Sequence, residues 1–181
     1  MLFAPINGGL ELRAEADGSH TIAGRFPYGT LAELGRGRRE TFAPGAFTLQ
    51  DDVHLLAGHD YNRPLASRRS GSLTLTDADD GLAFEARISA DVADTSHGRD
   101  TLALVRAGLS VGLSPGFRVR PNGERVERRS GGLLRTVHGA DLFELSVVTR
   151  PAYDSAQVEA RSWQPENPAG SRSVPAAWRW R

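Results

Sequence analysis

The sequence predicts a mainly β fold with one or two short helices, built as a closed or nearly closed barrel. Apolar and polar residues alternate with a period of two over most of the first 160 residues, which is typical of half-buried strands. These strands follow one another across short turns rich in Gly, Pro and Asp, instead of alternating with long helices as in a parallel α/β sheet.

Two hairpins stand out in this pattern. Residues 10–15 alternate apolar and charged side chains, Asp17-Gly18 offers a turn, and a second strand follows over residues 21–26. The clearer hairpin pairs residues 72–76 with residues 82–88, across a loop whose closing glycine supplies a positive φ.

The middle of the chain predicts a buried strand and a helix. The apolar residues 53–57 indicate a short buried strand that ends just before a Gly-His pair. Either Thr95 or Ser96 caps a helix that runs through Ala107, and Gly108 ends it.

Three more strands are expected at residues 109–120, 133–137 and 142–148. Pro151 ends the last of them, and residues 157–160 predict a further short strand.

Composition divides the chain into a folded domain, residues 1–161, and a tail, residues 162–181, which is rich in Pro, Gly and Ser. One interpretation of the tail is a flexible end with incidental aromatic residues. The other is a docking peptide, because aromatic and Arg side chains dominate binding hot spots and the tail contains Trp163, Trp178 and Trp180.

Charge and composition exclude several classes of function. The chain has 22 basic and 22 acidic residues, which gives no overall attraction to nucleic acid or to an anionic membrane. It has no Cys, so disulfides, thiolate metal sites and a cysteine nucleophile are excluded. We see neither a signal peptide nor an apolar stretch that spans a bilayer, and expect a soluble intracellular protein.

Three polar residues in strand-like surroundings supply the parts of an acyl-transfer site. His59 follows an apolar strand, and an imidazole exchanges protons near neutral pH. Ser114 lies between Gly112 and Gly116, which share its face of a strand and leave space for a substrate backbone. Glu144 interrupts an apolar run, where a carboxylate is costly unless paired, and this suits a group that orients a histidine.

Each of these residues also has a purely structural interpretation. His59 alone is an ordinary hydrogen-bonded histidine, the glycines around Ser114 mark a bulge or bend, and Glu144 faces outward on a half-exposed strand. Ser110 is the second choice of nucleophile, and we expect it to point the same way as Ser114. His138 is an alternative third member of the site.

The sequence gives little support for a metal or cofactor site. His54 and His59 are five residues apart, so on one regular strand they face opposite sides. No metal-binding motif or phosphate-binding glycine loop is present, and we expect neither metal nor cofactor. A metal-dependent hydrolase that uses His59, Asp60 and His138 is a weaker alternative.

Taken in order, several segments resemble the prohead maturation proteases of tailed bacteriophages, a serine peptidase family related in fold to the herpesvirus assembly proteases. The matching segments are Phe42–Phe47, Leu55–Asp60, Pro64–Ala66, Gly81–Ala86, Leu113–Phe117 and Leu142–Tyr153.

The resemblance implies a serine endopeptidase with His59 as general base, Ser114 as nucleophile and Glu144 as the group that holds the imidazole. It implies a herpesvirus-protease-like mixed β-barrel flanked by short helices, and no cofactor. Substrates are then capsid or scaffold precursors and the protease itself, inside the immature shell in the host cytoplasm. The sequence leaves open whether the chain forms a homo-oligomer.

One position departs from the family pattern. The family usually has an apolar residue with a backbone N–H between the Ser and the Gly, where this chain has Pro115. Proline has no N–H to donate to an oxyanion. A catalytically weak or inactive capsid assembly factor with the same fold is therefore the alternative function.

Overall fold

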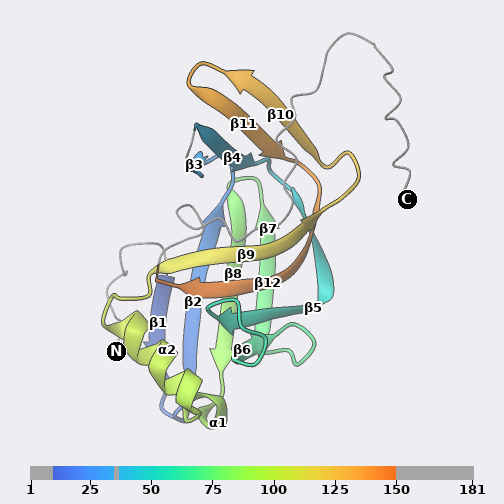
Figure 1. Ribbon diagram of the computed structural model, residues 1–181. Helices are drawn as coiled ribbons and strands as arrows, with labels where there is room; N and C mark the ends of the chain where they lie inside the picture. Colours follow the sequence, from blue (N-terminus) through green and yellow to red (C-terminus); the bar gives the residue numbers. More distant parts are fainter. Residues whose placement is uncertain (1–9, 35–36, 150–181) are drawn as a thin grey trace, which may run out of the picture.

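The computed structural model describes residues 10–34 and 37–149. Over these residues the chain forms twelve strands and two helices (Figure 1). The predicted mainly β fold with few helices is confirmed. The strand expected at residues 157–160 and the tail with its three Trp residues lie outside the described residues.

The first sheet contains both predicted hairpins. Its order is β1 (Leu10–Ala14), β2 (His20–Pro27), β8 (Gly81–Ile88) and β7 (Leu73–Ala78), and every neighbouring pair is antiparallel. Along β8 the buried and less buried residues alternate, because one face lies on the core.

The turn of the second hairpin differs in detail from the expectation. Only Asp79 and Asp80 separate the two strands, and Gly81 already belongs to β8. A Cβ at Gly81 would lie 2.5 Å from the backbone oxygen of Phe26 on β2. Glycine is needed here because the neighbouring backbone approaches closely.

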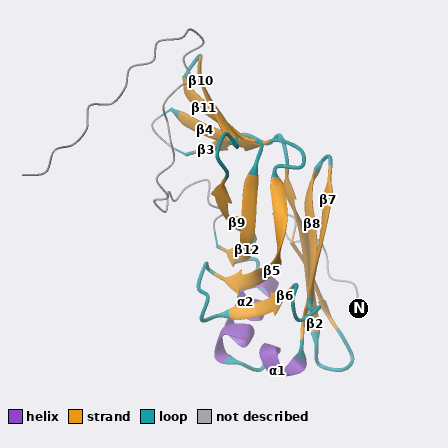
Figure 2. Cartoon of the chain, turned by 90° about the vertical axis from the view of Figure 1, so that its right-hand side faces the viewer, coloured by secondary structure: helices purple, strands orange, loops and turns teal. Residues whose placement is uncertain are grey.

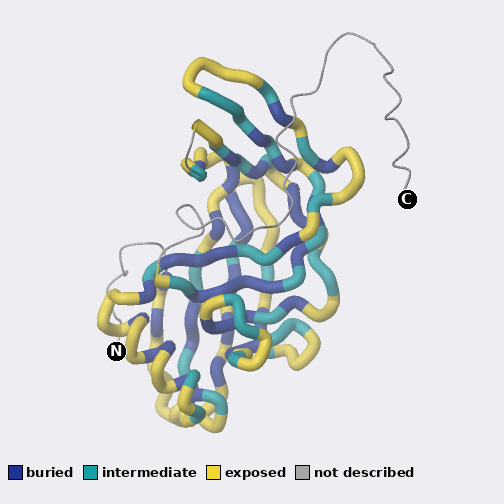
Figure 3. The backbone as a smooth tube through the Cα atoms, in the orientation of Figure 1, coloured by how far each residue is buried: buried dark blue, intermediate teal, exposed yellow. Residues whose placement is uncertain are grey.

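The second sheet has the order β10 (Glu124–Arg129), β11 (Gly132–Val137), β4 (Arg38–Phe42) and β3 (Ala32–Glu33). β11 and β4 are parallel, although they lie far apart in the sequence. In Figure 3 the β10–β11 hairpin is largely exposed at its tip.

The third sheet holds the candidate site. Its order is β6 (Pro64–Ser67), β5 (Phe47–Ala57), β12 (Ala140–Val148) and β9 (Gly112–Val119). β12 is parallel to β5 and antiparallel to β9 (Figures 1 and 2). As an inner strand, β12 is buried along most of its length (Figure 3).

The expected closed barrel is not what the described residues form. Each sheet is open, and its two outer strands have no further strand partner among these residues. The sheets meet instead through a shared core in which aromatic rings from different sheets touch. Phe42 of β4 lies 5.2 Å from Phe26 of β2 and 5.1 Å from Phe117 of β9, between ring centroids. Side-chain packing therefore replaces hydrogen-bonded closure.

Two helices follow β8: α1 (Ala90–Ala93) and α2 (Ser96–Arg106). Of the two predicted caps the structure has Thr95, whose side-chain oxygen accepts the Gly98 N–H at 3.1 Å. Gly108, with a φ of 69°, follows the C-cap as predicted. Neither of these helices has the length and apolar character that crossing a bilayer requires.

A buried ion pair joins β11 to β4. Arg135 and Glu40 are 3% and 4% exposed, and Nη1 of Arg135 lies 2.5 Å from Oε2 of Glu40. The same guanidinium also bonds to Glu124 of β10. Arg135 thus links three strands of the second sheet, where an uncompensated charge would be costly.

We predict that Arg135→Met lowers the free energy of unfolding by about 3–5 kcal/mol, because the buried carboxylate of Glu40 then loses its ion pair with Arg135. Urea denaturation followed by circular dichroism measures the loss. The control is Arg129→Met, which removes an exposed arginine of β10 and should change stability by less than about 0.5 kcal/mol. Equal urea midpoints for the two variants would contradict the prediction.

Candidate active site

A β-bulge at Phe143 decides which face of the third sheet Glu144 occupies. Leu142 pairs with Phe117 of β9, whereas Glu144 pairs with Gly116, so Phe143 has no partner on β9. On a regular strand Leu142 and Glu144 would share a face. The extra residue instead turns Glu144 away from the core that buries Leu142.

Four residues then lie together on the face of the sheet opposite to the core, which we call the site face. Glu144 and Ser146 come from β12, and they pair with Gly116 and Ser114 of β9. Glu144, Ser146 and Ser114 are 4%, 0% and 1% exposed. Buried polar side chains at such density require partners for their charges and hydrogen bonds.

The loop after β5 brings His59 to this face. β5 ends at Ala57, and Gly58 and His59 both have a left-handed backbone, with φ of 69° and 63°. The Gly58 N–H donates to the Val147 oxygen at 3.1 Å, and the Ala57 N–H donates to the Arg63 oxygen at 3.0 Å. These bonds hold the loop beside β12, and the consecutive positive φ values turn the chain sharply.

Hydrogen bonds connect His59, Ser146 and Glu144 in a closed ring. The His59 N–H donates to Oγ of Ser146 at 2.9 Å, and that hydroxyl donates to Oε2 of Glu144 at 2.6 Å. Oε1 of Glu144 lies 2.6 Å from Nδ1 of His59. Since Nδ1–H donates to the carboxylate in the neutral imidazole, Nε2 is the nitrogen that can accept a proton.

The electrostatics of this ring favour a protonated imidazole. The hydrogen bond to Glu144 raises the pKa of His59 above 6.5, with a smaller contribution from the charge of Glu144, while burial acts in the opposite direction. Burial raises the pKa of the nearby Tyr61 phenol, and the negative charge of Glu144 raises it further. His59 is therefore tuned as a stronger base than a free histidine.

Gly116 has a different use from the one expected. A Cβ at this position would lie 2.1 Å from Oε1 and 2.7 Å from Cγ of Glu144. The space that the glycine leaves is filled by the Glu144 carboxylate, not left for a substrate backbone. The missing side chain on β9 thus allows the carboxylate of β12 to lie flat across the neighbouring strand.

Ser114 lies beside this ring without bonding to it. It is directly opposite Ser146 in the antiparallel pair of β9 and β12, where side chains are about 5 Å apart at their Cβ atoms. Its hydroxyl is buried and has no hydrogen-bond partner, so it makes no bond to His59. The structure thus joins two of the three predicted residues directly and puts the third next to Ser146.

Pro115 follows on β9, which is an outer strand of its sheet in the described chain. Proline is tolerated at sheet edges because one side of the strand needs no ladder hydrogen bonds.

Ser110 lies in another environment. The strand begins at Gly112, not at Leu109 as expected, so Ser110 precedes it and its N–H donates to the Leu104 oxygen of α2. Ser110 and Ser114 therefore do not share a strand, so the strand periodicity on which their common direction was predicted does not apply. Ser110 instead lines a pocket of about 460 Å³ with Ala57, Gly58, Arg63, Thr101, Leu104, Val147, Val148 and Thr149.

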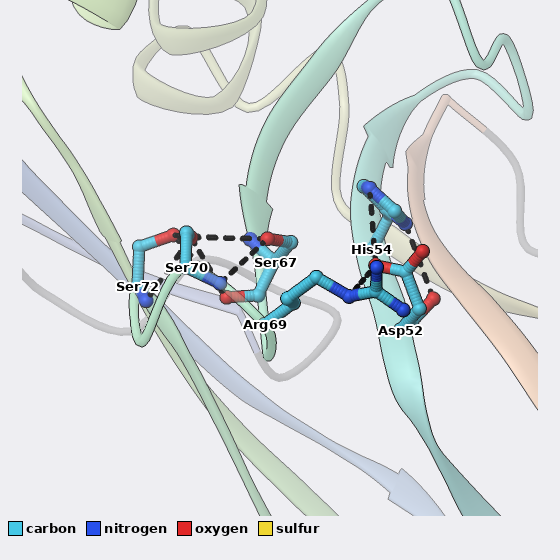
Figure 4. A network of polar contacts seen from close by, with 6 residues as sticks. All are labelled: Asp52, His54, Ser67, Arg69, Ser70 and Ser72. Carbon is cyan, nitrogen blue, oxygen red and sulfur yellow. Dashed lines mark hydrogen bonds and ion pairs between the residues drawn. The ribbon is translucent and has the colours of Figure 1, made fainter.

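His54 is bound to other residues, although it pairs with Glu144 across β5 and β12. Its Nδ1 lies 3.2 Å from the backbone oxygen of Asp52, and its Nε2 lies 3.8 Å from the Asp52 carboxylate, which Arg69 also approaches (Figure 4). The prediction that His54 and His59 face opposite sides assumed one regular strand through both residues. It does not apply, since the strand ends at Ala57.

The nearby hydroxyls of Ser67, Ser70 and Ser72 bond to one another at the turn after β6 (Figure 4). This serine cluster is structural, because its bonds close the turn.

The remaining candidates are separated from one another. The Asp60 carboxylate accepts the Asn62 N–H at 2.9 Å, and Nε2 of His138 lies 2.8 Å from the Asn122 oxygen. Among residues 10–34 and 37–149, no group of three His, Asp or Glu side chains is arranged to hold a metal ion. The alternative set of His59, Asp60 and His138 thus gains no support from the geometry.

Sequence analysis missed Ser146, which closes the hydrogen-bonded ring. The signal was present: like Glu144, Ser146 interrupts an apolar run, and the two are separated by one residue. Polar residues two apart on a buried strand share a face and can serve one another.

Comparison with known proteins shows the family of the chain. The family model described as caudovirus prohead serine protease matches residues 9–169. The chain belongs to this family. The resemblance inferred from the sequence is confirmed, and membership implies a serine peptidase of phage head maturation. The chain matches no curated protein and no solved structure.

We predict that Gly116→Ala disrupts the site more than the fold. The new Cβ displaces the Glu144 carboxylate and breaks its bond to His59, which should lower proteolytic activity about 100-fold, as for a misplacement of about 1 Å. Cleavage of a capsid precursor measures the loss. The control is Gly139→Ala, whose Cβ meets nothing closer than 3.4 Å. Equal activity of the two variants would contradict the assigned role of Gly116.

We also predict that Glu144→Gln lowers the pKa of His59, because the charged partner is lost while burial still opposes protonation. Nuclear magnetic resonance titration of the imidazole signals measures the pKa of His59, and the His59→Gln variant identifies which signal belongs to this residue. A raised pKa stabilises the fold below about pH 6.5, and this contribution is lost as the pH rises through the folded value. If activity requires neutral His59, it should appear at a lower pH in Glu144→Gln than in the parent, because the imidazole loses its proton at a lower pH. An unchanged titration would exclude Glu144 as the cause.

Proposed function

We propose that this chain is a serine endopeptidase of phage head maturation in which Ser114 is the nucleophile, His59 the general base and Glu144 the residue that orients the base. The observation that supports the proposal best is the 2.6 Å bond between Nδ1 of His59 and Glu144, fixed through Ser146 and located beside a serine with no other partner. Family membership supports the same chemistry.

In the proposed reaction, Nε2 of His59 takes the hydroxyl proton of Ser114 as Oγ attacks the peptide carbonyl. The proton then passes to the leaving amine, the C–N bond breaks and an acyl-enzyme remains. Water, activated by the same nitrogen, releases the new carboxylate and restores Ser114. Glu144 stabilises the imidazolium that forms in each half of the reaction.

Two features of β9 set conditions on this mechanism. Pro115 has no N–H, so the donors that stabilise the oxyanion come from other backbone or side-chain groups. The Ser114 hydroxyl is buried, so the substrate must gain access to it and the His59 bond must form on binding. Catalytic hydrogen bonds often tighten only in the complex with substrate.

The proposed substrates are capsid or scaffold precursors inside the prohead, together with the protease itself. We also propose that the fold of this chain is related to that of the herpesvirus assembly proteases.

A second candidate is a capsid assembly factor with weak or no catalysis. It is favoured by Pro115 and by the absence of a bond between Ser114 and His59. A fluorophosphonate probe separates the two proposals, since it labels only an activated serine. Labelling of Ser114 that is lost in His59→Gln supports the protease, and folded protein without labelling supports the assembly factor.

We predict that Ser114→Ala lowers cleavage of a coexpressed capsid precursor by up to about 10⁶-fold, in line with nucleophile removal in other serine proteases. Mass spectrometry of both chains measures the processing. The matched control is Ser19→Ala, which removes a hydroxyl that is also buried but lies directly before β2 of the first sheet, outside the ring and the pocket. Parental processing by Ser114→Ala, with loss in Ser110→Ala, would assign the nucleophile to Ser110 instead.

A further inference from the structure

The pocket of about 460 Å³ lies immediately next to the site and is formed by the ends of its strands. Gly58, which precedes His59, and Val147, which follows Ser146, both line it. Its far wall comes from α2, which contributes Thr101 and Leu104. The histidine loop therefore contributes both to the candidate catalytic ring, through His59, and to this pocket, through Gly58.

Arg63 gives the pocket a positive charge. Among the described residues that line the pocket it is the only charged one, and it is half-buried. Its side chain makes no ion pair or hydrogen bond with any residue of the described chain. A guanidinium held without a carboxylate in a partly buried pocket is a strong recognition element for an anionic group.

The backbone fixes the position of Arg63. Its N–H donates to the Asp60 oxygen at 2.9 Å, and its oxygen accepts the Ala57 N–H at 3.0 Å. The same two bonds close the loop that carries His59. The backbone positions of Arg63 and His59 are thus fixed relative to each other by one short segment.

Two buried hydroxyls complete the polar lining. Thr101 and Ser110 are 4% and 5% exposed, while Ala57, Leu104 and Val147 supply apolar surface. A pocket whose described residues supply one cation, two hydroxyls and an apolar wall matches a short aliphatic side chain that ends in a carboxylate.

Distance along the strand relates the pocket to the scissile bond. Ser114 is opposite Ser146, and Val148 of the pocket lies two residues further along β12. Two residues of a strand span about 7 Å, which is also the span of two residues in an extended substrate. The pocket can thus take a side chain one or two residues from the peptide bond that Ser114 attacks.

We propose that this pocket selects an acidic residue of the substrate, Glu or Asp, next to the cleavage site, with Arg63 as the group that binds its carboxylate. The inference rests on the proposed function and adds the substrate class. Charge-assisted hydrogen bonds to Arg63 should favour Glu over Gln at that position by about 10- to 100-fold in kcat/KM.

The test uses the full chain and a library of peptides from a digested proteome, with the products sequenced by mass spectrometry. The parent should show Asp and Glu enriched at one position close to the cut. In Arg63→Glu that enrichment should disappear and be replaced by Lys and Arg, because the charge of the pocket is reversed. The control is Arg106→Glu, which makes the same charge change on the exposed end of α2 outside the pocket and should keep the parental profile.

The outcomes separate this inference from the proposed function. Cleavage with no acidic enrichment, or an Arg63→Glu profile equal to the parental one, overturns the inference and leaves the protease intact. Failure of the parent to cleave any peptide, including the coexpressed capsid precursor, overturns the protease and the inference with it. If acidic residues are selected only as the free C-terminal carboxylate of peptides, the pocket binds a chain end instead, which also overturns the inference.

Discussion

The hydrogen bond between Glu144 and His59 is the interaction on which the candidate site depends. A carboxylate that is 4% exposed is unfavourable by itself, and here it has two donors, the imidazole and the Ser146 hydroxyl. The bond from the imidazole to Glu144 fixes the ring of His59 and raises its pKa. The interaction that stabilises the buried Glu144 carboxylate therefore also makes His59 a stronger base.

Three features of the fold make this bond geometrically available. The bulge at Phe143 turns Glu144 out of the core, Gly116 leaves room for its carboxylate, and the left-handed turn at Gly58 and His59 returns the imidazole to β12. Each is a local departure from regular sheet geometry. Departures of this kind collect at functional sites because a regular sheet cannot converge side chains from three strands.

Local patterns predicted the elements better than their arrangement. The hairpins, the α2 cap and the strands around Ser114 and Glu144 follow from alternation and turn residues, which act over a few positions. Strand β10 was missed because its sequence, Glu124–Arg129, is almost entirely charged and gives little apolar alternation. The predicted closed or nearly closed barrel is not confirmed in the described chain. Closure depends on which distant strands pair, and nothing in one sequence records the parallel pairing of β5 with β12. Likewise, the apolar surroundings of Glu144 predicted it as a site residue. The bulge that turns its side chain out of the core was not predicted, because it depends on the pairing with β9.

The chain order of the third sheet has a consequence for biosynthesis. β12 supplies both Glu144 and Ser146, lies between β5 and β9, and is the last strand of the described chain to leave the ribosome. Until residue 148 has been made, neither its parallel nor its antiparallel ladder can form, and pairings over such long separations form slowly. A nascent chain thus lacks the complete hydrogen-bonded ring of His59, Ser146 and Glu144 until translation has passed the whole sheet.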